Sequence, residues 1–295
     1  MKLKLIINPV AEKGRAEKTC HNKITSFFKE NHVEFEIEST VGIGDGTRLG
    51  RKAVEEGFDT IVTIGGDGTA NEVINGIVGS NVTFGIIPCG EGNDFAKMIG
   101  VSRRNLKAAC QTILDGYTKT IDLGMVNGRY FYNTFGVGFD AEVAEKKEKS
   151  FRFLRGYYAY LLQVIPHIFT YRPKLVKISM DGINMESKIL FIAVGNGRYT
   201  GGGFKTIPLS EIDDGLLDIC IIQYPGRLYM LRNLSRVSKG KHLSLPVVFY
   251  FKGKEINITA TEPLTAHIDG EIFKEPEFNI KLVPQALRMI VRKPE

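Results

Sequence analysis

The stretch Thr60-Ile-Val-Thr-Ile-Gly-Gly-Asp-Gly-Thr-Ala70 decides the fold. Residues 60–64 are typical of a buried strand, and the glycines after them let the backbone turn sharply and approach phosphate oxygens. The helix predicted over 70–78 presents free N–H groups and a positive dipole end to such an anion. Asp67 favours phosphate only where a cation intervenes, which indicates Mg²⁺. The alternative, a tight turn capped by Asp67, does not require two adjacent glycines and a third, so we expect a phosphate-binding loop.

A second glycine-rich loop, Gly90-Glu-Gly-Asn-Asp-Phe-Ala96, follows the strand predicted at 84–87. Asn93 or Asp94 could simply cap the helix predicted over 93–99. Because parallel sheets bind ligands in the crevice at the carboxyl ends of their strands, both loops are expected at one site.

Strands and helices alternate over the first 125 residues, which predicts an α/β domain over 1–125 with a parallel sheet covered on both faces. Strands are expected at 3–7, 35–38, 60–64 and 84–87, and helices at 16–31, 47–56, 70–78 and 93–99. From 126 to 295 the chain is mostly strands punctuated by Gly and Pro, which predicts an antiparallel β-sandwich domain. Its expected strands are 175–180, 189–194, 217–223, 247–252, 255–259, 264–269 and 278–282, with one basic helix at 228–239.

The composition is that of an ordinary globular protein. Of the 295 residues, 43% are hydrophobic and 24% charged, which excludes a disordered or collagen-like chain. No window approaches the roughly 18 apolar residues of a membrane-spanning helix, and Asn8-Pro9 comes too early for a secretory signal. Four widely spaced cysteines without a CxxC pattern indicate a reduced, cytoplasmic protein.

The chain carries a net charge of +6, from 39 basic and 33 acidic residues, which suits anionic partners unless the charge is evenly scattered. The densest basic cluster is followed at once by the aromatic-rich stretch 156–169. The cluster consists of Lys146, Lys147, Lys149, Arg152 and Arg155. Together they are the best candidate for a surface facing an anionic membrane. A nucleic-acid partner is not expected, because no aromatic-plus-basic motif of a known module is present.

Several motifs together resemble those of the bacterial diacylglycerol kinase and sphingosine kinase superfamily of soluble lipid kinases. They are Asn8-Pro9, GGDGT at 65–69, GNDFA at 92–96, IDLG at 121–124, YNTFGVGFD at 132–140, RGYYAY at 155–160, DGLLD at 214–218 and DGE at 269–271. GGDGT alone is less specific, since NAD kinases also have it and phosphofructokinases carry a near relative. The remaining motifs favour lipid kinases, and the resemblance covers nearly the whole chain.

The resemblance implies a nucleotide-binding α/β domain like that of NAD kinases and phosphofructokinases, a C-terminal β-sandwich for the lipid, and an active site between them. About ten final residues would return to the first domain. The residues implied in ATP binding are Asn8, Thr40, Gly65, Gly66, Asp67, Gly68, Thr69, Asn71, Glu91 and Asn93. The family usually has Thr where this chain has Glu91, and a carboxylate there repels ATP phosphates unless it binds metal or points away.

The acidic residues have separate roles in the family pattern. Asp67, Asp94 and Asp122 would form a network around catalytic Mg²⁺, and Glu271 would be the general base. A second, structural Mg²⁺ would use the Asp214 carboxylate and carbonyls near Glu211 and Leu216. From the residues alone, Asp213-Asp214-Gly215 could be only a turn. Likewise, Asp269-Gly270 could form a hairpin turn that leaves Glu271 in solvent.

We therefore expect an ATP- and Mg²⁺-dependent lipid kinase that phosphorylates a lipid hydroxyl, with diacylglycerol as acceptor and phosphatidic acid as product. The same chemistry on phosphatidylglycerol, a sphingoid base or NAD is one alternative. A nucleotide-binding regulatory protein of weak activity is the other, and Glu91 is the residue that favours it. The expected location is cytoplasmic and peripheral to an anionic membrane, and a homodimer is left open.

Overall fold

The computed structural model describes residues 2–9, 21–90, 92–150 and 164–294, with no side chains described for 147–150. The chain divides into two compact units. Unit 1 is Met1–Ile121 with Gln285–Glu295, and unit 2 is Asp122–Pro284. The predicted boundary after residue 125 lies within β5 (Thr118–Val126), the strand that leads from unit 1 into unit 2.

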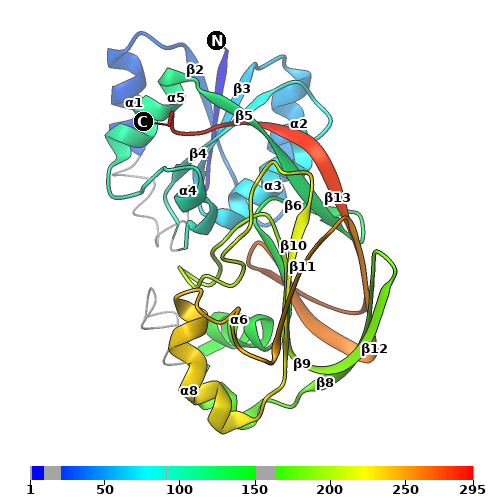
Figure 1. Ribbon diagram of the computed structural model, residues 1–295. Helices are drawn as coiled ribbons and strands as arrows, with labels where there is room; N and C mark the ends of the chain where they lie inside the picture. The colour runs from blue at the N-terminus through cyan, green and yellow to red at the C-terminus, as the bar shows by residue number, and fades with distance from the viewer. Residues whose placement is uncertain (1, 10–20, 91, 151–163, 295) are drawn as a thin grey trace. The chain divides into compact units, whose positions relative to one another are not determined.

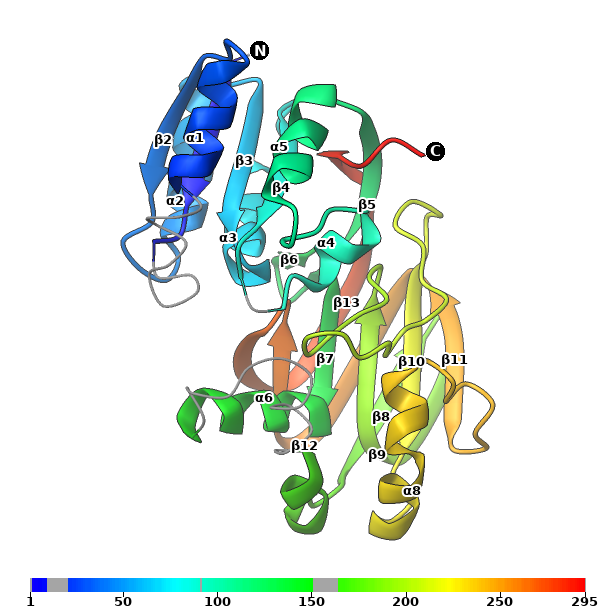
Figure 2. The same ribbon diagram turned by 90° about the vertical axis from the view of Figure 1, so that its left-hand side faces the viewer.

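Unit 1 is an α/β domain, as predicted. Its parallel strands are β1 (Leu3–Ile7), β2 (Phe35–Ser39), β3 (Thr60–Gly65) and β4 (Thr83–Pro88), in the order β2-β1-β3-β4. Its helices are α1 (His21–Glu30), α2 (Asp45–Glu55), α3 (Asp67–Ile77), α4 (Asp94–Met98) and α5 (Leu106–Asp115). Figures 1 and 2 show α1 and α5 on one face of the sheet and α2 and α3 on the other. Because both faces are covered, every residue of β1, β3 and β4 is buried.

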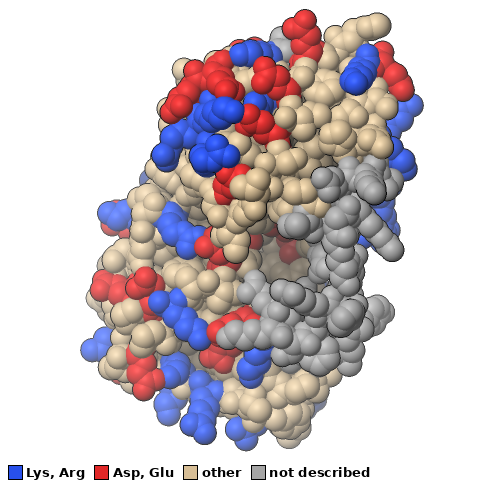
Figure 3. Space-filling view, turned by 180° about the vertical axis from the view of Figure 1, so that it is seen from behind, with Lys and Arg blue, Asp and Glu red and all other residues tan. Residues whose placement is uncertain are grey.

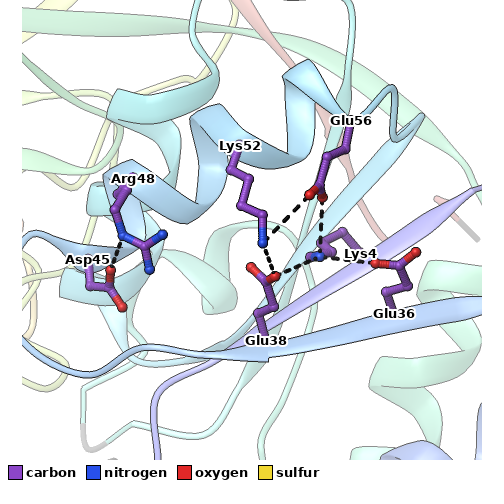
Figure 4. A network of polar contacts seen from close by, with 7 residues as sticks. All are labelled: Lys4, Glu36, Glu38, Asp45, Arg48, Lys52 and Glu56. Carbon is purple, nitrogen blue, oxygen red and sulfur yellow. Dashed lines mark hydrogen bonds and ion pairs between the residues drawn. The ribbon is translucent and has the colours of Figure 1, made fainter.

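A network of charged side chains lies at the β2 edge of this sheet (Figure 4). The Lys4 ammonium is buried and pairs with Glu36 at 3.2 Å, Glu38 at 3.3 Å and Glu56 at 3.5 Å. Lys52 of α2 also pairs with Glu38. Burial opposes ionisation of Glu38, but the hydrogen bonds and charges of Lys52 and Lys4 outweigh it and lower its pKa. In its ionised form Glu38 therefore links Lys4 of β1 to Lys52 of α2.

Unit 2 is an antiparallel, sandwich-like β domain, as predicted. Its strands are β6 (Arg129–Phe131), β7 (Thr134–Gly138), β8 (Lys174–Met180), β9 (Ile183–Gly195), β10 (Leu217–Gln223), β11 (Val248–Gly253), β12 (Glu255–Ile268) and β13 (Glu271–Ile290). The main order is β11-β10-β9-β7-β12-β13, while β8 pairs with β9 and β12, and β6 with β5. The helices are α6 (Phe139–Ser150), residues 164–170 and α8 (Arg227–Ser238). Figures 1 and 2 show α6 and α8 on one face of the sheet.

Alternate residues of the central strands pack into two different apolar cores. In β9, Ile192 and Val194 belong to the core between the strands, whereas Phe191 and Ala193 belong to the core beneath the helices. This alternation is what a sheet buried on both faces requires, because successive side chains of a strand point to opposite faces.

Two predicted strand boundaries are wrong. The strands expected at 255–259 and 264–269 are one strand, β12, with a shift of register between Thr259 and Leu264. β13 extends far beyond the expected 278–282. In both cases prolines were read as breaks, yet irregular pairing lets a strand pass through them.

The predicted membrane-facing surface lies mostly outside the described residues, which leave out 151–163 and the side chains of 147–150. Lys146 is described, and its ammonium contacts Nδ1 of the buried His167 at 2.7 Å. On the face drawn in Figure 3, basic side chains alternate with acidic ones rather than forming one patch. Among the helices that the structure describes, none has the length and apolar character needed to cross a membrane.

Candidate active site

The glycine-rich turn of unit 1 joins β3 to α3. β3 ends at Gly65, Gly66 caps the helix without a side-chain bond, and α3 begins at Asp67. Ala70 N–H donates to the Gly66 carbonyl at 3.1 Å and closes the first turn, and the N–H groups before it have no helical carbonyl to bind. The start of α3 therefore has the donors and the dipole end that bind phosphate.

The second glycine-rich loop touches the first. Gly65 and Pro88 are partners at the ends of β3 and β4, so both loops leave the sheet at the same edge. A Cβ on Gly90 would lie only 2.4 Å from the Cα of Gly66, which leaves no room for a side chain. Both loops therefore lie together at the carboxyl edge of the parallel sheet, as the sequence predicts.

Asn8 and Thr40, which are also expected to contact ATP, follow the ends of two other strands of this sheet. Asn8 follows β1, and its Nδ2 donates to Thr69 Oγ1 at 3.0 Å. Thr40 follows β2, and its N–H donates to the Ile7 carbonyl at 2.8 Å. Thr40, Thr69 and Asn71 are all buried. The structure thus gathers the ends of three strands and the start of α3, while nucleotide contact by these residues stays a prediction.

Two of the three carboxylates predicted around catalytic Mg²⁺ meet in unit 1. Asp94 N–H donates to Asp67 Oδ2 at 3.1 Å, and Lys97 Nζ donates to Asp94 Oδ1 at 2.6 Å. A Cβ on Gly92 would lie 3.1 Å from Asp67 Oδ2 and 3.6 Å from Asp94 Oδ2, so both oxygens face the same glycine. Two carboxylates completed by substrate phosphates are a usual donor set for Mg²⁺, and these residues fit that ion.

The Asn93 side chain forms hydrogen bonds within its own loop. It adopts a left-handed conformation with φ of 47°, its Oδ1 accepts Gly90 N–H at 3.0 Å, and its Nδ2 donates to the Gly90 carbonyl. Its amide therefore shapes the turn that carries Asp94. Glu91 lies outside the described residues.

The third predicted carboxylate, Asp122, belongs to unit 2 and organises a loop there. Its Oδ2 accepts Gly215 N–H at 2.8 Å, its own N–H donates to the Ile212 carbonyl at 2.8 Å, and its carbonyl accepts Asn196 Nδ2 at 2.7 Å. Asp122 is fully buried. Its carboxylate therefore supports residues 211–216, and its role in a metal network with the other two stays a prediction.

At the predicted second Mg²⁺ site, the ammonium of Lys252 is paired with the Asp214 carboxylate. Asp214 Oδ2 contacts Lys252 Nζ at 2.5 Å, and Asp214 Oδ1 accepts Leu216 N–H at 3.2 Å. Lys252 also lies 3.5 Å from Asp218, its directly opposite partner across the β10–β11 ladder. Burial raises the pKa of Asp218. Burial alone would lower the pKa of Lys252, but the hydrogen bond to Asp214 and the two negative charges raise it.

An ammonium is paired with a carboxylate in both places, Lys252 with Asp214 and Asp218 and Lys97 with Asp94, so a metal ion would have to displace a lysine in either one. Across the described ranges, no group of three or more His, Cys, Asp and Glu side chains is arranged to hold a metal. We derive no step through a second ion, and the roles of Glu211, Asp214 and Leu216 as its ligands stay predictions.

The hairpin between β12 and β13 carries the predicted base. Asp269 and Gly270 form its turn with φ of 48° and 97°. The buried Asp269 carboxylate accepts N–H groups of Tyr132 at 3.1 Å and Thr134 at 2.8 Å, which is a structural role. Glu271 begins β13 with its side chain 44% exposed, and its Oε2 lies 2.6 Å from an Arg129 nitrogen. An exposed carboxylate at a fixed position can accept a proton from a hydroxyl.

An apolar pocket that the sequence did not indicate lies in unit 2, among α6, residues 164–170, α8 and the sheet. Its cavity volume is about 70 Å³. Apolar residues that line it include Ile168, Phe191, Ile222 and Val237. Asp140 also lines it, and among the described residues its buried Oδ1 has no hydrogen-bond partner. A mostly apolar lining with a few polar groups is typical of small-molecule sites.

Comparisons with known proteins agree with this architecture. The chain matches the diacylglycerol kinase catalytic domain over residues 2–126 and the YegS C-terminal NAD kinase beta sandwich-like domain over 133–291. It is 30% identical over 270 residues to the diacylglycerol kinase of Bacillus subtilis, covering 91% of this chain and 89% of the relative. It is also 30% identical over 297 residues to that of Mycobacterium tuberculosis, covering 98% and 94%.

A crystal structure of a diacylglycerol kinase from Bacillus anthracis is similar to this one, with a TM-score of 0.76 at 27% identity over 99% of this chain and 97% of that one. The chain therefore belongs to the diacylglycerol kinase catalytic domain family, with the C-terminal domain that accompanies it.

Proposed function

We propose that this protein is an ATP-dependent lipid kinase that phosphorylates the hydroxyl of diacylglycerol and releases phosphatidic acid and ADP. Membership of the family supports the kinase chemistry, and relatives at 30% identity are named diacylglycerol kinase. The observation that carries the choice of a lipid acceptor is the apolar pocket of unit 2, because a soluble acceptor such as NAD has no acyl chain to place there.

In unit 1 the chain binds and holds the donor. The N–H groups at the start of α3 bind the ATP phosphates, and the close approach of Gly66 and Gly90 leaves the loop open to them. Asp67 and Asp94 would hold Mg²⁺, which neutralises phosphate charge when bound. Asn8 fixes the Thr69 hydroxyl toward this edge.

Residues of unit 2 bind the acceptor lipid and remove its hydroxyl proton. The Glu271 carboxylate takes the proton of the lipid hydroxyl as the new oxygen–phosphorus bond forms and the bond to the β-phosphate oxygen breaks. The apolar pocket takes an acyl chain, whose removal from water contributes about 0.8 kcal/mol per methylene.

Phosphate transfer to separate acceptors tests this function. The protein is incubated with radiolabelled ATP, Mg²⁺ and micelles that contain diacylglycerol, phosphatidylglycerol or a sphingoid base, with NAD in a fourth reaction. Label in phosphatidic acid is the expected result. Label only in NADP or in another lipid would select that acceptor, and ATP binding without transfer to any of them would select a regulatory protein.

The role of the apolar pocket in acceptor binding is tested by a substitution that narrows the pocket. Val237→Phe, on its lining, is expected to raise KM for long-chain diacylglycerol several-fold while leaving KM for ATP unchanged. The matched control is Leu228→Phe, on the same helix α8 but 80% exposed. Equal effects of the two substitutions would remove the pocket from acceptor binding.

The substrate also implies a membrane partner. We propose reversible binding to anionic bilayers through basic and aromatic side chains, since the lipid resides in a bilayer. Sedimentation with anionic vesicles should decrease as salt rises, and equal binding to neutral and anionic vesicles would contradict it.

A further inference from the structure

Two hairpin turns of unit 2 share one geometry. Asn127 and Gly128 join β5 to β6 with φ of 49° and 83°, and Asp269 and Gly270 join β12 to β13 with φ of 48° and 97°. Positive φ at both central residues defines a tight turn that matches the twist of its strands. The residue after each turn, Arg129 or Glu271, is therefore delivered at a fixed place.

The β5–β6 hairpin is tied to β13 through Asn127. Its Nδ2 donates to the Glu277 carbonyl at 2.9 Å, and its Oδ1 accepts Asn279 N–H at 2.8 Å. A backbone bond from Asn127 N–H to the Asn279 carbonyl, at 3.1 Å, adds a third link. The strand that begins with Glu271 thus holds the turn that precedes Arg129.

A second tie runs the opposite way, from the β12–β13 turn to the segment after β6. The Asp269 carboxylate accepts the N–H groups of Tyr132, Asn133 and Thr134 at 3.1, 3.2 and 2.8 Å. Asp269 N–H donates in turn to the Thr134 carbonyl at 2.9 Å. The two hairpins are therefore fixed to one another on both sides of the Arg129–Glu271 pair.

The ion pair itself has a rigid support. Arg129 and Glu271 approach to 2.6 Å, and the Arg129 guanidinium carbon lies 5.5 Å from the centre of the Phe273 ring. Phe273 in turn packs against Phe135 and Phe278. Most exposed ion pairs contribute little because two flexible side chains must be ordered. Here the backbone ties fix the positions of both hairpins, and the Phe273 ring packs against the Arg129 guanidinium.

We propose that Arg129 is a positioning residue that holds the Glu271 carboxylate aimed at the acceptor hydroxyl. This inference rests on the proposed function of Glu271. A guanidinium cannot take up the proton, so Arg129 orients the base without competing with it. The pair uses Oε2 of Glu271, and the other carboxylate oxygen is the atom we assign to the hydroxyl.

A double-mutant cycle tests the inference in the full chain. Arg129→Met, Glu271→Gln and the double variant are compared with the unaltered protein for kcat, for both KM values and for melting temperature. Arg129→Met should lower kcat by about a hundredfold, the effect of a misplaced catalytic group, with KM for ATP unchanged. It should add nothing further in the Glu271→Gln background. Arg129→Lys should recover part of the loss.

Lys274→Met is the matched control. Lys274 lies on β13, the strand of Glu271, and forms an exposed 3.0 Å pair with Glu145. It should leave kcat within about twofold, as removal of an ordinary surface pair does. An equal loss from Arg129→Met in both backgrounds would show that Arg129 acts on a substrate directly. A loss that parallels a fall in melting temperature would show a structural role. Normal turnover of Glu271→Gln would instead reject the proposed base, and normal turnover of Arg129→Met beside an inactive Glu271→Gln would reject this inference alone.

Discussion

The phosphate-binding loop of unit 1 and the Arg129–Glu271 region of unit 2 are built in different ways. The loop comes from one short run of chain, and its donors are backbone N–H groups presented by glycines. The Arg129–Glu271 region joins two hairpins through side chains, with Tyr132 and Asp269 separated by 137 residues. A backbone site survives changes of most neighbouring side chains, whereas a side-chain site depends on each member. The predictions below test that contrast.

The largest loss of turnover is expected at Asp67, because its side chain, unlike the backbone N–H groups of the loop, can be removed by substitution. Asp67→Ala should reduce turnover by about a thousandfold or more, because it removes half of the metal-binding pair, and metal clamps supply much of the stabilisation in phosphoryl transfer. The melting temperature should stay near that of the control Glu55→Ala, an exposed change on α2. Turnover near normal at saturating Mg²⁺ would remove Asp67 from the mechanism.

Glu271→Gln should lose about a hundredfold to ten-thousandfold in kcat, the usual cost of removing a general base. Its melting temperature and ATP affinity should not change, since the side chain is 44% exposed and lies in unit 2. Thermal denaturation and steady-state kinetics measure the two properties separately. An active Glu271→Gln variant would mean that another group takes the proton.

Asp269→Asn should have the opposite profile. The buried carboxylate accepts three backbone N–H groups, and an amide cannot satisfy them all, which costs about 2 kcal/mol of unfolding free energy. Activity should fall only as far as folding does, as chemical denaturation beside kinetics would show. A stable but inactive Asp269→Asn variant would reverse the roles of Asp269 and Glu271.

Without nucleotide, removal of divalent metal should leave the melting temperature of the unaltered protein unchanged, because Lys252 already pairs with Asp214 and Asp218. Lys252→Met should lower the unfolding free energy by about 1–3 kcal/mol, since the buried Asp218 loses its cation. Melting with EDTA and with Mg²⁺ is the measurement. A fall in the melting temperature in EDTA that persists in the Asp67→Ala variant would show that a metal, not the lysine, binds Asp214.

The smallest effect is expected at the Lys4 network. The pKa of Glu38 is lower in the folded protein than in the unfolded chain. Its contribution is therefore complete above the unfolded pKa, which lies near 4.5, and is lost as the pH falls through the folded pKa. The Glu38–Lys52 pair is partly exposed, and exposed pairs contribute about 0.2–1 kcal/mol. Glu38→Gln should flatten the acid side of the stability profile, and an unchanged profile would show that the network does not contribute.

The sequence was sufficient for the fold and for the backbone part of the site. Short buried strands, Gly65-Gly66 and the turn at Gly90 follow local rules that need no knowledge of distant residues. Helix α5 was not predicted, although it has local signals, since Asn105 caps its start and Gly116 ends it. Arg129, Lys252 and the apolar pocket could not be derived, because each depends on strands that pair only in the folded chain.

The strand β13 starts in unit 2 and its last residues belong to unit 1, where Arg288 and Met289 pair with Thr83 and Phe84 of β4. Met289 and Ile290 are buried there. A ribosome makes β4 long before it makes residue 288, so the sheet of unit 1 waits with one edge unpaired while all of unit 2 is translated. An unpaired edge is where chains associate wrongly. We therefore expect a nascent chain to be most prone to wrong association between the synthesis of β4 and that of residues 288–290.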